Sequence, residues 1–163
     1  MAAGRLTEPV TKVVRVAEFA LGSEAFRHGG EIPRRHTCDG DDVSPVLSWS
    51  DPPPDARALA LIVDDPDAPV GIFTHWLAWN IDPQARGLEE GESAPVEGRN
   101  DFGRRGWGGP CPPPGHGAHR YVFRLYALDA ELEVGSRAGR RELESALAGH
   151  VLRTAELMGT YER

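Results

Sequence analysis

Glycine and proline gather at three places in this chain, and those clusters limit its fold more than any other feature. Most of the 14 prolines and several of the 19 glycines fall within residues 51–54, 66–71 and 103–117. A proline inside a helix or a central strand removes a backbone donor, and a glycine there costs conformational entropy. The clusters are therefore expected to be loops, and this punctuation argues against a helical bundle.

The length and composition fit one globular domain. A chain of 163 residues, with 40% hydrophobic and 26% charged residues, is long enough to bury one core. No internal repeat and no long linker divides it. We expect a single domain over residues 1–163, in which residues 1–11 lack periodicity and are flexible.

The net charge of −7 argues against one class of partner. Nucleic-acid binding needs clustered Lys and Arg, and this chain has a single lysine, Lys12. The same sign argues against docking on anionic membranes. No run of about 18 apolar residues is present, and Met1–Val10 has no apolar signal-peptide core. We expect a cytoplasmic protein without stable membrane insertion; the sequence leaves its oligomeric state open, a homodimer included.

The two cysteines, Cys38 and Cys111, are too few to indicate a disulfide framework. Thiols stay free in a reducing cytoplasm, so free thiols are the expectation and a bridge between the two is the alternative. Cys111 lies between prolines in a loop and shows no sign of activation as a nucleophile.

Apolar and β-branched runs predict strands between the loops. Ala58–Val63 is a continuous apolar run, which is typical of a strand covered on both faces. Alternation along Phe73–Ile81 places His75 on a face with apolar neighbours. The same alternation along His119–Leu128 directs its first and third residues, a histidine and a tyrosine, to one face. Further strands are expected at Lys12–Phe19 and Val43–Ser50.

The last segment changes its period. Apolar residues recur at helical spacing after a candidate N-cap at Ser136, at Leu143, Leu147, Val151, Ala155 and Met158. The pattern predicts one amphipathic helix of roughly 20 residues that ends near Gly159 and packs on a sheet. Strands joined by Gly/Pro turns, followed by this helix, predict a mostly β fold: an antiparallel β-sandwich with peripheral helices.

Polar residues stand at the ends of these strands. Asp65 and Asp67 follow an apolar strand, and the prolines between and after them, Pro66 and Pro69, stiffen the loop. The cis or trans state of each proline is left open. Taken alone, such a D-P-D sequence is most often a solvated turn. His75 alone is more often a hydrogen-bonded core residue than a ligand.

A second group lies at the start of the strand 119–128. His119 and Tyr121 are two residues apart, so the strand period aims an imidazole and a phenol at one spot. Arg120 points to the opposite face, where an ion pair with Asp101 is expected. The preceding loop 103–117 is too rich in Gly and Pro for a helix or strand, and its glycines allow close backbone approach to a ligand.

Two long segments of this chain resemble the signature regions of a known family. The first is Asp65-Pro-Asp-Ala-Pro69 followed by His75-Trp76, and the second is Gly106-Trp-Gly-Gly-Pro-Cys-Pro-Pro-Pro-Gly-His-Gly-Ala-His-Arg-Tyr121. Both are similar to regions of the phosphatidylethanolamine-binding proteins, also called Raf kinase inhibitor-like proteins. Shorter stretches, Ile32–Gly40 and Gly98–Asp101 among them, resemble the bacterial and archaeal branch.

The resemblance implies a β-sandwich with an anion-accepting pocket at one end. By motif, the pocket residues carried over to this chain are Asp65, His75, Pro113, His119 and Tyr121, with Asp67 and Pro112 close by. The long helical additions of some eukaryotic members are missing here, which puts in doubt the protein-partner functions that depend on them.

Three functional hypotheses follow. The first is a binding protein for a small anionic or phosphate-bearing ligand, such as a lipid head group, held weakly by imidazole and phenol donors and more tightly at low pH. The second is a hydrolase or cyclase in which Asp65, His75 and His119 act as acid–base groups. The third is a kinase or protease inhibitor that acts through a protein partner. The two histidines lack the compact spacing of a zinc motif, and we expect no metal and no cofactor.

Overall fold

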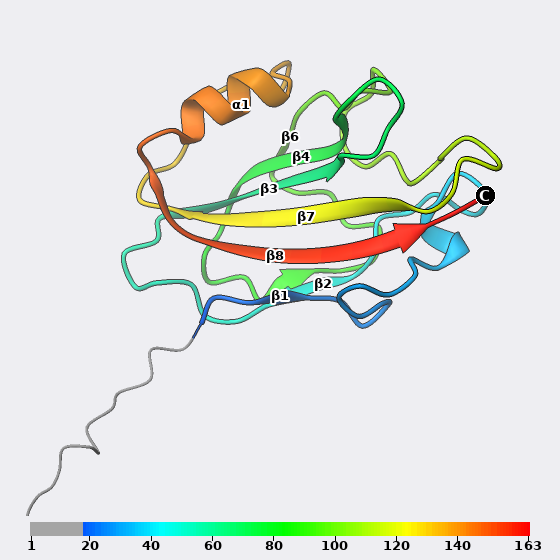
Figure 1. The fold of residues 1–163 in the computed structure, drawn as a ribbon. Coiled ribbons are helices and arrows are strands. Elements are labelled where there is room, and N and C mark those ends of the chain that lie inside the picture. Colours follow the sequence, from blue (N-terminus) through cyan, green and yellow to red (C-terminus); the bar gives the residue numbers. More distant parts are fainter. Residues whose placement is uncertain (1–17) are drawn as a thin grey trace, which may run out of the picture.

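The computed structural model describes residues 18–163, whose regular structure is mainly two antiparallel β-sheets (Figure 1). One sheet has three strands in the order β1-β2-β5, and the other has five in the order β6-β4-β3-β7-β8. The strands are β1 (Leu21–Gly22), β2 (Leu47–Trp49), β3 (Ala58–Asp65), β4 (Phe73–Ile81), β5 (Gly87–Leu88), β6 (Val96–Glu97), β7 (His119–Leu128) and β8 (Val151–Tyr161); the helical elements are the 3-10 turn η3 (Arg34–His36) and helix α1 (Arg140–Leu147). The predicted mostly β, antiparallel architecture is confirmed. The predicted flexible segment 1–11 lies outside the described residues, as does most of the predicted strand 12–19.

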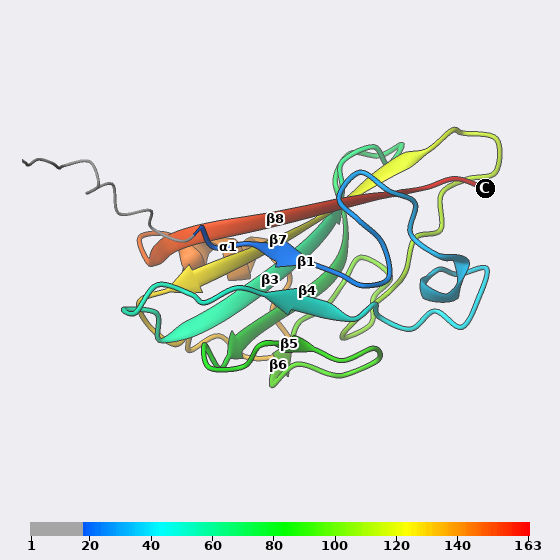
Figure 2. The ribbon, with the colours of Figure 1, turned by 90° about the horizontal axis from the view of Figure 1, so that it is seen from below.

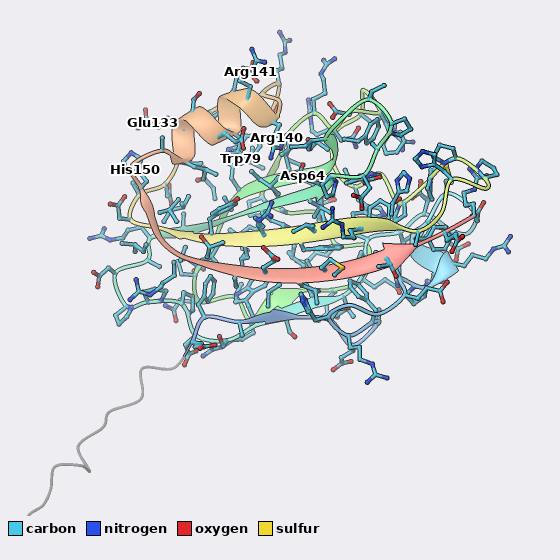
Figure 3. The ribbon with its side chains drawn as sticks, in the orientation of Figure 1. Asp64, Trp79, Glu133, Arg140, Arg141 and His150 are labelled. Atoms are coloured by element: carbon cyan, nitrogen blue, oxygen red, sulfur yellow. A yellow bond between two sulfur atoms is a disulfide. The ribbon has the colours of Figure 1, made fainter. Side chains whose placement is uncertain are left out.

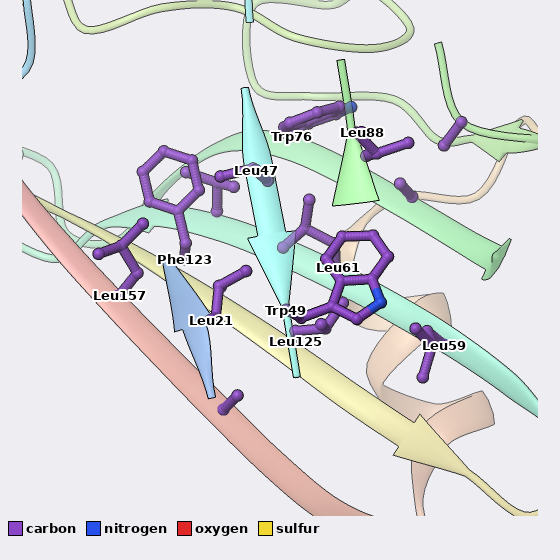
Figure 4. Close-up of a cluster of buried hydrophobic side chains, with 14 of the residues drawn as sticks. Leu21, Leu47, Trp49, Leu59, Leu61, Trp76, Leu88, Phe123, Leu125 and Leu157 are labelled. Atoms are coloured by element: carbon purple, nitrogen blue, oxygen red, sulfur yellow. The ribbon is translucent and has the colours of Figure 1, made fainter. Parts of the chain in front are cut away.

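The five-stranded sheet has the smaller sheet on one face and α1 on the other (Figures 1 and 2). An apolar core lies on each of these faces. Between the two sheets, Trp49 of β2 packs in one cluster with Trp76 and Phe123 of the larger sheet (Figure 4). On the opposite face lies α1, whose Leu143 belongs to a second cluster with Trp79 of β4. Every residue of β3 is buried, which confirms the prediction of a strand covered on both faces.

The C-terminal segment is a short helix followed by a strand, so the prediction of one long helix is wrong. α1 begins after Gly139 rather than Ser136 and ends at Leu147, and Gly149 then adopts a φ of +83°. β8 follows and pairs with β7 along its whole length. The apolar residues beyond Leu147 that suggested a helix therefore lie on a strand, because the hydrogen-bonded ladder with β7 overrides their spacing. Within residues 18–163, no helix has the length and apolar character to cross a membrane.

A buried ion pair joins α1 to the five-stranded sheet (Figure 3). Asp64 of β3 is only 3% exposed, and its carboxylate accepts hydrogen bonds from Arg140 Nη2 at 2.8 Å and Nε at 3.1 Å. The hydroxyl of Thr74, on the neighbouring strand β4, donates to the same carboxylate at 3.1 Å. The partners Asp64 and Arg140 are 76 residues apart, and no local sequence pattern indicated the pair.

Cys38 and Cys111 form a disulfide, so the prediction of free thiols is wrong. That prediction depended on an assumed reducing compartment, whereas the fold brings the two Cα atoms to 5.4 Å, within the range of a bridge. The bridge joins the segment after η3 to the loop 103–117, and beside it the Cys38 amide donates to the Pro110 carbonyl at 3.1 Å. The Gly/Pro loop is therefore attached to the rest of the protein near its midpoint.

Candidate ligand-binding site

A cavity of about 260 Å³ opens at the end of the five-stranded sheet where β3 ends and β4 and β7 begin, at the right in Figure 1. The antiparallel register explains why these ends meet, since Asp65 lies opposite Phe73, and Asp64 opposite Val122. The polar residues of the lining are Asp65, His75, His119 and Tyr121, and the others are Ala68, Pro69, Val70, Phe73, Phe102, Cys111, Pro112 and Pro113. The structure thus brings together every residue predicted for the site except Asp67.

Asp65 holds two parts of the site in place. One carboxylate oxygen, Oδ2, accepts a hydrogen bond from His119 Nδ1 at 2.7 Å, and the other, Oδ1, accepts from the Asp67 amide at 2.7 Å. Asp65 is 4% exposed and His119 is 2% exposed. The second bond closes a turn after β3, in which the peptide bonds before Pro66 and Pro69 are both trans. Asp65 therefore orients the His119 ring and shapes the loop, and both of its oxygens are engaged by the protein.

His75 presents one ring nitrogen to the site and uses the other for its own positioning. Its Nδ1 donates to the Gly108 carbonyl at 2.6 Å, because a carbonyl oxygen can only accept. The ring packs against Phe73, Phe102 and Tyr121, with centroids 5.1, 5.4 and 5.2 Å away. Burial lowers the pKa of His75, although the Gly108 carbonyl and the Asp65 charge oppose the shift. At neutral pH its Nε2 therefore carries a lone pair rather than a proton.

Tyr121 supplies a donor that the protein itself leaves unused. The residue is 1% exposed, and its buried hydroxyl has no hydrogen-bond partner among the described residues. Burial raises the pKa of this phenol, and the nearby Asp65 carboxylate raises it further by its charge and as an acceptor close to the hydroxyl, although the two groups do not meet hydrogen-bond geometry. The hydroxyl therefore keeps its proton, and a buried donor without a partner is costly enough to call for an explanation.

Asp67 turns away from the cavity and pairs with Arg120. Arg120 donates to both carboxylate oxygens, from Nη2 at 2.8 Å and Nε at 2.9 Å, and its backbone amide adds a bond at 2.9 Å. These hydrogen bonds lower the pKa of Asp67 to about 2. The predicted pair of Arg120 with Asp101 is wrong: Asp101 accepts from the Thr74 amide at 2.7 Å. The turn after β3 places Asp67 beside the start of β7, a proximity that alternation along one strand does not reveal.

The Gly/Pro loop forms one wall of the cavity and is anchored at several points. The loop residues Pro112 and Pro113, in the lining, directly follow the disulfide-bonded Cys111. Trp107 packs with its ring centroid 5.5 Å from that of Trp76 and so holds this part of the loop against β4. The C-terminal Arg163 accepts a hydrogen bond from the Gly115 amide at 3.1 Å. The wall is therefore a fixed part of the site up to the residues just before His116.

An apolar rim surrounds the polar groups, and no pattern in the sequence indicated it. Val70 and Phe102 in the lining are 88% and 40% exposed, and Phe73 packs on Phe102 with ring centroids 4.8 Å apart. Phe102 follows Gly98–Asp101, a stretch that resembled the family without indicating a place in the fold. The rim could be found only from the folded chain, because its members come from separate loops.

A metal site and a second hollow are the alternatives to this cavity. Within residues 18–163, no group of three or more His, Cys, Asp or Glu side chains is arranged to hold a metal ion. A larger hollow of about 650 Å³ lies near Phe19, the prolines 52–54 and Arg153, towards the opposite end of β8 from the first cavity. Every residue that lines it is exposed or half-buried. The cavity at Tyr121 is therefore the better candidate for a specific ligand.

Known proteins similar to this chain point to one family. The family model for phosphatidylethanolamine-binding proteins matches residues 22–162. A UPF0098 protein of Pyrococcus abyssi is 47% identical in an alignment of 154 residues that covers 90% of this chain and 86% of that protein. A UPF0098 protein of Methanothermobacter thermautotrophicus is 48% identical in an alignment of 150 residues that covers 88% of this chain and 98% of that protein.

Two crystal structures are similar to this chain in fold as well as in sequence. CT736 of Chlamydia trachomatis, a putative phosphatidylethanolamine-binding protein homologue, has a TM-score of 0.85 and 42% identity, and the match covers 90% of this chain and 98% of that one. YbcL of E. coli, described as a new member of the mammalian family, has a TM-score of 0.85 and 32% identity over 90% of this chain and 99% of that one. The similarity therefore covers most of the chain, both sheets included.

Proposed function

The chain belongs to the phosphatidylethanolamine-binding protein family, and from that premise we propose that its cavity binds a small anionic or phosphate-bearing ligand. The observation that supports this most is the buried, unpartnered hydroxyl of Tyr121 in the cavity lining. An anionic oxygen in the cavity gives that donor the acceptor it lacks, and charge-assisted hydrogen bonds are stronger than neutral ones. The apolar rim suits a ligand that also carries carbon, such as a lipid head group with its glycerol.

The charge of the lining predicts weak binding. Among residues 18–163, no Lys or Arg side chain lines the cavity, so an anion there is held by hydrogen bonds without a fixed positive charge. At neutral pH Tyr121 offers its proton, whereas His75 presents a lone pair at Nε2. Both oxygens of Asp65 are engaged, which limits its repulsion of the ligand without removing it. The site is therefore expected to be a low-affinity pocket whose strength depends on protonation.

The change Tyr121→Phe is expected to weaken ligand binding without destabilising the fold. Affinity for glycerophosphoethanolamine, measured by isothermal titration calorimetry, should fall about 10- to 100-fold, the worth of a hydrogen bond to a charged group. The free energy of unfolding should stay within about 0.5 kcal/mol or rise, because the variant no longer buries an unsatisfied hydroxyl. Tyr126→Phe is the matched control, since Tyr126 lies on the same strand against the helix-side core. Equal affinities for all three proteins would contradict the proposal.

Anion affinity is expected to rise as the pH falls from 8 to 5. Protonated His75 donates from Nε2 to an anion, and its lowered pKa places most of the gain in the acidic part of this range. Sulfate is a suitable probe, because it keeps its charge throughout and leaves the protein as the titrating partner. Calorimetry on the unaltered chain should show the rise, and His75→Gln should flatten it. A constant sulfate affinity in the unaltered chain would rule out a titrating donor.

Acid–base catalysis is the second candidate, and one contact favours it. Asp65 accepts from His119 Nδ1 at 2.7 Å, an arrangement that fixes the tautomer of a histidine used as a general base. Hydrolysis of small phosphate or carboxylate esters that disappears with Asp65→Asn would support this function. Binding of the same compounds without turnover would support the binding function instead.

A further inference from the structure

His119 stands in the cavity lining, yet neither of its ring nitrogens is free. Its Nδ1 donates to the Asp65 carboxylate at 2.7 Å, and its Nε2 lies 2.7 Å from Nδ1 of His116. The two imidazole rings are 4.9 Å apart between centroids, in an edge-to-face arrangement. Whichever ring carries the proton between them, Nε2 of His119 is occupied. A residue of the same chain therefore already holds the position that a ligand needs.

His116 is placed so that it can leave this position. The residue is exposed, in contrast to the buried His119, and its ring makes no other hydrogen bond within the described chain. It lies between Gly115 and Gly117, whose φ values of +77° and +94° are conformations that glycine adopts without strain. At both glycines the position of a Cβ has no atom within 4 Å. Open space therefore lies on both sides of His116, and its ring can turn away from His119 while its backbone amide keeps the bond to the Pro113 carbonyl at 3.1 Å.

An anion that binds His119 must compete with His116. Because Nδ1 of His119 donates to Asp65, its Nε2 accepts from an acidic ligand hydroxyl such as P–OH, or donates to an anionic oxygen once the ring carries a second proton. That nitrogen lacks room for a second partner while His116 lies 2.7 Å away. The hydrogen bond to the ligand and the hydrogen bond to His116 are thus mutually exclusive.

We propose that His116 is an internal competitor that occupies His119 Nε2 in the free protein and is displaced when an acidic ligand binds. The inference rests on the proposed anion site and assigns to it a residue that sets its affinity and its ligand class. An acidic group can form a hydrogen bond with His119 Nε2 in place of the one from His116. A neutral apolar compound that packs against Phe102 cannot, so the His116–His119 hydrogen bond stays intact. The pocket therefore selects for a negative charge although its lining carries no fixed positive one.

The change His116→Ala is expected to tighten anion binding. Affinity for inorganic phosphate at pH 7, measured by calorimetry, should rise about 3- to 10-fold, because the ligand no longer breaks an existing hydrogen bond. The matched control is His150→Ala: His150 is another exposed histidine with one side-chain partner, Asp129 at 2.7 Å, and lies far from the cavity (Figure 3). Its phosphate affinity should equal that of the unaltered chain. An unchanged or weaker affinity for His116→Ala would overturn the proposal, and a weaker one would make His116 a ligand contact.

A second measurement uses the unaltered protein and does not depend on a variant that folds. Nitrogen-15 NMR of the histidine rings should show His116 Nδ1 moving to the position of an unbonded imidazole as phosphate saturates the site. Retention of the His116–His119 bond at saturation would overturn the proposal while leaving the anion site intact. Absence of any phosphate binding that depends on Tyr121 would overturn the proposed function and this inference together. The outcomes therefore separate a failed competitor from a failed site.

Discussion

Replacing Cys38 and Cys111 together by serine is expected to lower the free energy of unfolding by about 2–5 kcal/mol. The bridge spans 73 residues of sequence, so its removal frees a long loop in the unfolded chain. Chain-entropy estimates for a loop of this length give about 4 kcal/mol. Urea denaturation followed by circular dichroism measures the change.

Reduction of the unaltered chain provides the control. A reductant should lower the stability of the unaltered protein towards that of the Cys38→Ser, Cys111→Ser variant and leave the variant unchanged. Agreement between the two treatments assigns the loss to the bridge rather than to the serines. A loss below about 0.5 kcal/mol in both would show that the anchor points around Arg163 and Trp107 hold the loop without it.

Arg140→Ala is expected to cost about 3 kcal/mol of stability. Asp64 is only 3% exposed in the unaltered chain, and the change leaves its carboxylate with the Thr74 hydroxyl as its remaining side-chain donor. A buried charge that loses its partner is strongly destabilising, whereas an exposed one is not. Arg141→Ala is the matched control, since Arg141 is the next residue of α1 and is exposed, and it should change stability by less than about 0.5 kcal/mol (Figure 3). Equal losses in both variants would mean that water reaches Asp64 readily.

The strands were the part of the fold most open to prediction from the sequence. β3 is a continuous apolar run because both of its faces are covered, and β7 alternates so that Tyr121 and Phe123 share one face. In β4 the same rule fails twice. A register shift between Thr74 and Trp76 leaves His75 packed on Tyr121, whereas Leu77 lies in the helix-side core. At the end of the strand Asn80 has a φ of +57°, and Ile81 packs in the core between the sheets rather than beside Trp79. Local patterns predict a strand as long as its backbone stays regular.

The helix prediction failed because side-chain spacing does not reveal partners. Residues 151–161 carry apolar groups at intervals compatible with either period, and the adjacent strand β7 decides in favour of a strand. Gly149, just before them, was the local sign of a break, since a positive φ there favours glycine. A glycine between two apolar stretches therefore outweighs a helical spacing that continues across it.

The remaining features of the site come from contacts between segments distant in sequence. The family motif located Asp65, His75, His119 and Tyr121, and the structure shows them around one cavity. The motif did not indicate that Asp67 would form an ion pair with Arg120, or that His116 would form a hydrogen bond with His119. Each depends on where two loops meet, which no pattern within one segment encodes.

The ladder between β3 and β7 has a consequence for synthesis of the chain. The cavity needs the end of β3 beside the start of β7, and β7 begins only at His119, long after β3 ends at Asp65. A nascent chain that ends before His119 thus has no binding site, and closing such long loops is slow compared with forming hairpins. Ligand present during translation can stabilise only chains that already include β7. Retention of ribosome-bound chains of increasing length on an immobilised ligand would therefore show the chain length at which β7 pairs with β3.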